Sequence, residues 1–132
     1  MALVVKLHPD DLPKKAELVD GKIFKKKIYD IEDKDVKFLG DKPAVIDFFG
    51  EWCGPCKVLS PVFDKLSDKY KDKIDFYKVD IDKELDIAVA FNVMSVPNLL
   101  FIPMKSEAKL LPGAPSESQL EELINEYLIN ED

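Results

Sequence analysis

The sequence predicts an α/β fold in which helices flank a central mixed β-sheet. Two observations carry this prediction. From residue 27 on, short apolar runs alternate with helical patterns, and the last two apolar runs are separated by only a few residues. Strand–helix–strand units favour parallel pairing, whereas strands joined by a short turn pair antiparallel. We therefore expect the order strand, helix, strand, helix, strand, helix, strand, strand, helix.

The beginning of the chain has the weakest patterns. With 132 residues the chain has the length of one domain, and we interpret residues 1–26 as an N-terminal extension and residues 27–132 as the domain. The extension contains a strand-like run at residues 3–7 and a turn signal at Asp20–Gly21. The first elements expected in the domain are a strand at residues 27–31 and then a short polar helix or loop.

The strongest patterns lie in the middle of the chain. Residues 44–49, AVIDFF, form a nearly continuous apolar run, which is typical of a strand covered on both faces. Apolar side chains then recur at helical spacing over residues 53–70, and Pro61 should kink this helix because proline lacks an N–H donor.

The second half completes the alternation. Its expected elements are a strand at 74–81, a helix at 83–92, strands at 98–103 and 107–111, and a helix at 116–129. Ser116 is the candidate N-cap of the last helix, with Gln119 three residues on as its capping-box partner.

Composition excludes some classes of partner. Acidic residues outnumber basic ones by 26 to 19, for a net charge of −7, which argues against a nucleic-acid surface. No apolar run approaches the roughly 18 residues that span a bilayer, so we expect no membrane association. The first residues, MALVVKLHPDD, do not form a signal peptide as given.

The chain has only two cysteines, Cys53 and Cys56, in the stretch EWCGPCK. A zinc site needs about four protein ligands, and the single histidine, His8, is far away in sequence. A structural disulfide is a weak explanation, because closing so short a loop removes little entropy from the unfolded chain. We favour a third interpretation over these two: the cysteines carry out chemistry on the sulfur of another molecule.

The position of the two cysteines supports that reading. They fall where a core strand ends and a helix begins, which is where α/β proteins place their sites. At the helix N-terminus, unpaired N–H groups and the helix dipole stabilise the Cys53 thiolate, which is the species that attacks a disulfide. Cys56, one turn on and expected to be more buried, is placed to resolve the mixed disulfide. Pro55 suits the first helical turn, where its missing N–H costs nothing.

Asp47 is the one charge in the central apolar run. Burial disfavours a charged carboxylate and raises its pKa, which suits a group that transfers protons. The alternative is an ordinary aspartate that caps a turn at the end of the strand.

The stretch from Trp52 to Lys57, WCGPCK, resembles the active site of the thioredoxin family, and the resemblance extends over residues 27–130. It implies a thioredoxin-like three-layer sandwich. By the same resemblance, Asp47 moves protons to and from the inner cysteine, and Lys78 tunes Asp47. The other residues that the resemblance assigns, all to substrate binding, are Trp52, Gly54, Pro55, Val96, Pro97 (as a cis-proline) and Gly113.

The resemblance implies a thiol–disulfide oxidoreductase that reduces protein disulfides through a reversible Cys53–Cys56 couple. It further implies disulfide-containing client proteins, no bound cofactor or metal, and electrons from a separate reductase such as a thioredoxin reductase. We expect a cytoplasmic monomer. The alternatives are an exported, periplasmic oxidase, isomerase or reductase, a binding module without turnover, and a factor whose cysteines only sense oxidants.

Several positions depart from the family pattern. Met94–Ser95 stands where many members have a basic residue and glycine, Asn98 follows the proline in place of threonine, and Phe49–Gly50 replaces Trp-Ala or Tyr-Ala. These positions line the expected substrate face, so we expect them to bear on partner preference more than on chemistry.

Overall fold

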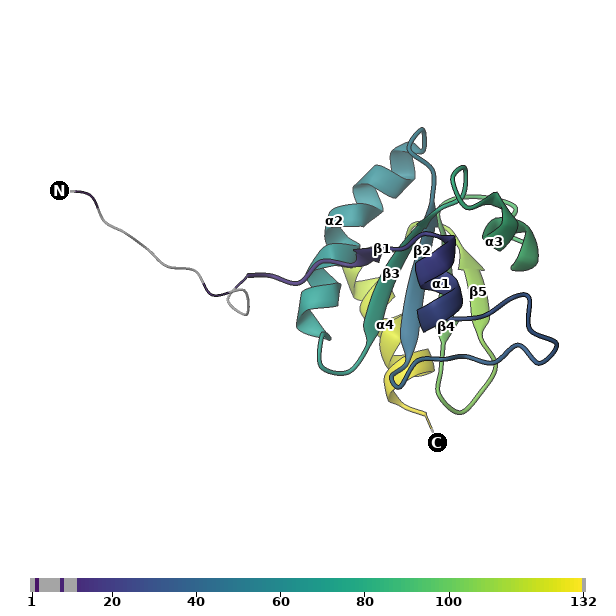
Figure 1. The fold of residues 1–132 in the computed structure, drawn as a ribbon. Helices are drawn as coiled ribbons and strands as arrows, with labels where there is room; N and C mark the ends of the chain where they lie inside the picture. Colours follow the sequence, from purple (N-terminus) through teal and green to yellow (C-terminus); the bar gives the residue numbers. More distant parts are fainter. Residues whose placement is uncertain (1, 3–7, 9–11, 132) are drawn as a thin grey trace.

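The computed structural model describes residues 2, 8 and 12–131, which form a three-layer sandwich with a β-sheet in the middle (Figure 1). Helices α2 and α4 cover one face of the sheet, and α1 and α3 cover the other. The elements are β1 (Glu17–Leu18), α1 (Gly21–Lys27), β2 (Ala44–Phe49), α2 (Gly54–Lys69), β3 (Asp75–Asp80), α3 (Leu85–Ala90), β4 (Asn98–Ile102), β5 (Lys109–Pro112), α4 (Glu117–Ile124) and the π-helical turn η2 (Asn125–Ile129).

The sheet has five strands in the order β1-β3-β2-β4-β5. Strands β1, β3 and β2 run parallel, and β4 and β5 run antiparallel to their neighbours, so the predicted mixed sheet and its terminal hairpin are confirmed. The expectation that each strand–helix–strand unit pairs in parallel was wrong for the last unit. Strand β4 does not pair with β3, because the chain crosses to the other side of β2 and returns in the opposite direction.

The first two elements lie earlier in the chain than the sequence predicted. Strand β1 pairs with β3, and α1 begins after Asp20, whose side chain accepts a hydrogen bond from the Ile23 N–H. The predicted division between residues 26 and 27 therefore falls inside α1. The residues of β1 and α1 belong to the same folded unit as the rest of the sheet.

The strand expected at residues 27–31 was wrong. The start of this segment ends α1, and its only ladder contact among the described residues is an isolated bridge between Tyr29 and Phe38. Ile28 and Tyr29 are buried, but against α1 and α3 rather than in a strand ladder. The strand-like run at residues 3–7 lies outside the described residues.

Two apolar cores separate the three layers. On one face, α1 and α3 bury Phe24 and Ile87 against the sheet. On the other face, α2 and α4 bury Phe63 and Leu120. Because successive side chains of a strand point to opposite faces, each central strand contributes to both cores.

The two longer helices begin as the sequence predicts. Helix α2 has Cys53 as its N-cap and Pro61 inside it. Helix α4 has the predicted capping box: the Ser116 Oγ accepts from the Gln119 N–H at 3.2 Å, and the Gln119 Oε1 accepts from the Ser116 N–H at 3.0 Å. The helix expected to reach residue 129 ends at Ile124 and continues as the wider turn η2.

Within the described part of the chain, no helix combines the length and apolar character needed to cross a membrane. The same residues contain no cluster of three or more histidine, cysteine or acidic side chains arranged to bind a metal ion.

Candidate active site

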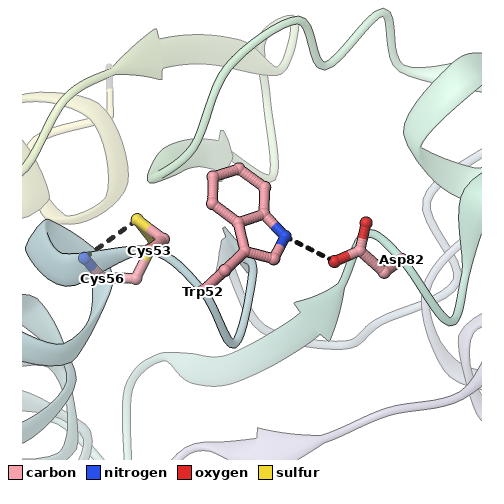
Figure 2. The surroundings of a disulfide bond; sticks show 4 residues. All are labelled: Trp52, Cys53, Cys56 and Asp82. Carbon is pink, nitrogen blue, oxygen red and sulfur yellow. Dashed lines mark hydrogen bonds between the residues drawn. A yellow bond between two sulfur atoms is a disulfide. The ribbon is translucent and has the colours of Figure 1, made fainter.

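The cysteine pair forms a disulfide at the N-terminus of α2 (Figure 2). Strand β2 ends at Phe49, and a tight turn follows in which the Cys53 N–H donates to the Gly50 carbonyl at 3.1 Å. This turn makes Cys53 the N-cap, and its Sγ accepts a hydrogen bond from the Cys56 N–H at 3.2 Å. The sulfur therefore faces the positive end of the helix dipole, where negative charge is stabilised.

The prediction that Cys56 is more buried than Cys53 was wrong for this oxidised form. Both residues are 4% exposed. The disulfide holds the two residues together with their Cα atoms 5.3 Å apart, so the two sulfurs share one environment. Between them, Gly54 and Pro55 are exposed in the first turn of α2.

Trp52 stands on the surface beside the disulfide, with 67% of the residue exposed. Its Nε1 donates a hydrogen bond to the Asp82 Oδ2 at 2.7 Å, which holds the indole in place (Figure 2). A Cβ atom at Gly50 would lie 2.8 Å from the Trp52 Cε2, so glycine leaves the space that the ring occupies. Asp82 was not among the predicted site residues, although its turn with Asp80 after β3 is a local signal.

Asp47 is buried beneath α2, with 1% of the residue exposed. Neither carboxylate oxygen has a hydrogen-bond partner among the residues that the structure describes. Burial raises the pKa of Asp47 to about 7 and is the largest cause of its shift. The positive charge of Lys78 lowers this pKa by a smaller amount, and the negative charge of Asp64 raises it. Asp47 and Cys56 line the same cavity of about 280 Å³.

Lys78 lies directly beside Asp47, because the two residues pair in register between β3 and β2. Its Nζ does not bond to Asp47. It donates to the Ser60 Oγ at 2.5 Å and forms an ion pair with the Asp64 Oδ1 at 3.2 Å. Ser60 and Asp64 were not among the predicted site residues, because their helical spacing alone assigns them to no site.

The Val96–Pro97 peptide bond is cis, as the resemblance implied. The sheet register puts this bond near the cysteines: Asn98 pairs with Phe48 at the end of β2, and Pro97 precedes Asn98. In the segment after β5, the Gly113 N–H donates to the Pro97 carbonyl at 2.9 Å. Gly113 has a φ of 112°, a conformation that favours glycine.

The predicted site residues thus fall into two groups. The buried group contains Asp47, Cys56 and Lys78 around one cavity. The second group comes from the turn before α2, from the two residues that precede β4 and from the segment after β5. Within it, Pro97 is buried and Val96 is half-buried, whereas Trp52, Gly54, Pro55 and Gly113 are exposed.

Comparisons with known proteins agree with this geometry. Residues 21–126 match the thioredoxin family model. The chain is 51% identical to a thioredoxin of Borreliella burgdorferi over 102 residues, which is 76% of this chain and 87% of that protein. It is 33% identical to a thioredoxin of Alicyclobacillus acidocaldarius over 67% of this chain and 85% of that protein. A chloroplastic M-type thioredoxin of Spinacia oleracea is 35% identical over 78% of this chain and 59% of its own length.

A helix-capping disulfide with the sequence CGPC, a buried aspartate behind it and a cis-proline at the neighbouring strand all occur where the family match covers the chain. Members of this family act on disulfide-containing substrates and are themselves reduced by a reductase. The chain belongs to the thioredoxin family of thiol–disulfide oxidoreductases, and Cys53 and Cys56 are its redox pair.

Proposed function

We propose that this protein works as a reductase of disulfides in client proteins, with Cys53 as the attacking thiolate and Cys56 as the resolving thiol. One observation carries the proposal: the disulfide caps α2 and shares a cavity with a buried carboxyl group that has no hydrogen-bond partner among the described residues. The first feature favours a thiolate, and the second supplies a group that can exchange protons with the inner sulfur.

The reaction transfers two electrons in two exchanges. In the first, the Cys53 thiolate attacks a client disulfide, forms a Cys53–client bond and releases one client sulfur as a thiolate, which takes a proton. In the second, the Cys56 thiolate attacks the Cys53 sulfur and releases the other client thiol. The client gains two electrons and two protons, and the protein is left with the Cys53–Cys56 disulfide described above.

Asp47 is the base for the second exchange in this proposal. Cys56 must lose a proton before it can attack, and Asp47 lines the same cavity. Because its pKa is about 7, the carboxyl group can accept and return a proton near neutral pH.

The surface residues are proposed to hold the client chain across the disulfide. Pro97 is buried, has no N–H donor, and its carbonyl already accepts from the Gly113 N–H, so it shapes this surface from below rather than bonding to the client backbone. Val96 and Gly113 flank it, and Trp52 and the exposed Gly54–Pro55 turn complete the client-binding surface in this proposal.

We infer that electrons come from a separate reductase and that no bound cofactor or metal takes part, because the cysteine pair itself carries the two electrons. Cytoplasmic location, a monomeric state and a thioredoxin reductase as donor are parts of the same proposal. The Gly-Pro dipeptide between the cysteines supports the reducing direction, since it resembles that of reducing family members.

The first test is the reduction potential of the Cys53–Cys56 couple, measured by equilibration in dithiothreitol buffers of known potential. A value below about −230 mV is expected for a reductase. A value between about −120 and −180 mV would contradict the reducing direction and indicate an exported oxidase or isomerase.

The second test separates the roles of the two cysteines. Cys56→Ser is expected to accumulate mixed disulfides with client proteins through Cys53, because the resolving thiol is absent. Cys53→Ser is the matched control and should trap none. Equal trapping by both variants would contradict the assigned roles, and trapping by Cys53→Ser alone would reverse them.

A further inference from the structure

The ammonium group of Lys78 is held by two side chains of α2 rather than by Asp47. We propose that Ser60 and Asp64 are positioning residues that hold Lys78 away from Asp47 and thereby set how readily Asp47 takes up a proton. This inference rests on the proposed function, because it concerns the proton step assigned there to Asp47.

The geometry favours this arrangement over a direct Lys78–Asp47 pair. Lys78 and Asp47 are neighbours in register on adjacent strands, and both line the cavity behind Cys56. The Lys78 Nζ nevertheless bonds to the Ser60 Oγ at 2.5 Å and pairs with the Asp64 Oδ1 at 3.2 Å. Asp47 keeps both oxygens without a hydrogen-bond partner among the described residues, so the cation beside it is already engaged.

This pair is partly shielded from water. The side chains of Lys78 and Asp64 are 15% and 23% exposed. A partly buried ion pair is screened less than a surface pair, so the position of its charges matters to a neighbouring carboxyl group.

Of the charged residues around Asp47, Lys78 is the cation that lies beside it in the sheet. Strand β4 places the apolar Leu99 opposite Asp47. The turn before α2 contributes Glu51, and α2 contributes Lys57, both exposed at the cavity's edge. Lys78 from β3 and Asp64 from α2 are the two charges that act on the titration of Asp47.

Asp64 is itself fixed from a second side. Its Oδ1 also accepts a hydrogen bond from the Ala16 N–H at 3.1 Å, from the segment that leads into β1. One oxygen therefore joins the start of the sheet to the ammonium group beside Asp47. Asp68 offers a matched control one turn along α2, because its Oδ1 accepts from the Lys14 N–H at 2.8 Å in the same manner.

The experiment is a titration of the Asp47 carboxyl carbon by NMR in the reduced full-length protein. Asp64→Asn should lower the titration midpoint of Asp47 by about one pH unit, because it removes a negative charge and frees Lys78 to pair with Asp47. Ser60→Ala should lower it by less, and Ser60→Thr should restore it because the hydroxyl returns. Lys78→Met should move the midpoint upward, and Asp68→Asn should leave it in place.

An Asp47 midpoint that is the same in Asp64→Asn, Ser60→Ala and Asp68→Asn would overturn the inference, and so would an upward shift in the first two. The Ser60→Ala and Ser60→Thr pair decides the matter if Asp64→Asn does not fold. The pH dependence of disulfide reduction is measured on the same variants. A midpoint that moves without moving the pH–rate profile supports the positioning role and rejects Asp47 as the base in turnover.

Discussion

The two faces of the sheet bury different chemistry. On the α1 and α3 face, the aromatic rings of Phe24, Tyr29, Phe48 and Phe91 pack together, with the Phe24 and Phe91 rings edge to face and their centroids 5.7 Å apart. On the α2 face, Asp47, the residue before Phe48 in β2, is a buried acid without a hydrogen-bond partner among the described residues. Consecutive residues of β2 thus serve opposite purposes.

This difference shows how the fold divides its tasks. Aromatic rings pack on both faces, since Phe63 and Phe76 also meet edge to face on the α2 side, but the α1 and α3 face carries none of the site residues. The other face keeps a carboxyl group in apolar surroundings, which costs stability whenever the group is charged. The predictions below test this division, beginning with the largest expected effect.

Removing an aromatic ring from the apolar face should cost stability and leave chemistry intact. Phe24 is 1% exposed, and Phe24→Ala is expected to lower the free energy of unfolding by about 3–5 kcal/mol, through lost burial and the cavity left behind. Urea unfolding measures the loss. Disulfide reduction at a temperature where the variant is folded should stay within about twofold of the unmodified protein. The reaction barrier should change by much less than about 1.36 kcal/mol, the amount that would change the rate tenfold. A parallel loss of turnover would show that the two faces do not act independently.

Changing the buried acid should have the opposite signature. The pKa of Asp47 is raised from 3.8 to about 7, so between these values the folded state binds more protons than the unfolded state and stability falls as pH rises. At 1.36 kcal/mol for each pH unit, the charged form costs up to roughly 4 kcal/mol above pH 7.

Asp47→Asn should therefore flatten the fall in unfolding free energy between about pH 4 and pH 7 and slow disulfide reduction near neutral pH. Urea unfolding across this range is the measurement, with Asp68→Asn as the control that keeps the slope. A slope that survives in Asp47→Asn would assign the titration to another group.

A smaller effect is expected on the surface beside the disulfide. Gly50→Ala would bring a Cβ atom to 2.8 Å from the Trp52 ring, so the indole should move and its bond to Asp82 should break. Because the bond is exposed, stability should change by less than about 1 kcal/mol. Trp52 is the only tryptophan, so its fluorescence reports the movement directly. Asp82→Ala should give a similar spectral change, and an unchanged spectrum in both would mean that the bond does not hold the ring.

The central part of the fold could be predicted from sequence because its patterns are strong and local. The run AVIDFF is apolar at both faces, and the helix after it repeats apolar residues over 16 residues. The N-terminal elements could not be placed in the same way. Strand β1 has two residues, and α1 buries only Phe24, so neither produces a periodic signal.

The site divides in the same way. The Cys53–Cys56 pair and the burial of Asp47 could be predicted because both follow from adjacent residues. Ser60 and Asp82 could not be assigned from the sequence, because their partners lie 18 and 30 residues away and only folding brings them together.

Helix caps give the last comparison between the two faces. Ser116 caps α4 and was predicted from its capping box, whereas Asp20 caps α1 and was interpreted as a turn. Either residue replaced by alanine should cost about 1 kcal/mol of unfolding free energy, because one N–H at the helix start loses its acceptor. The loss for Asp20→Ala should shrink in high salt, since its carboxylate also interacts with the helix dipole, and the loss for Ser116→Ala should not.

Urea unfolding at low and high salt measures both losses, and disulfide reduction measured alongside should be unchanged, because neither cap lines the cavity behind Cys56. Slower reduction in Ser116→Ala alone would show that α4 supports the site through the core it shares with α2. The boundary between structural and chemical roles would then lie within the α2 and α4 face rather than between the two faces of the sheet.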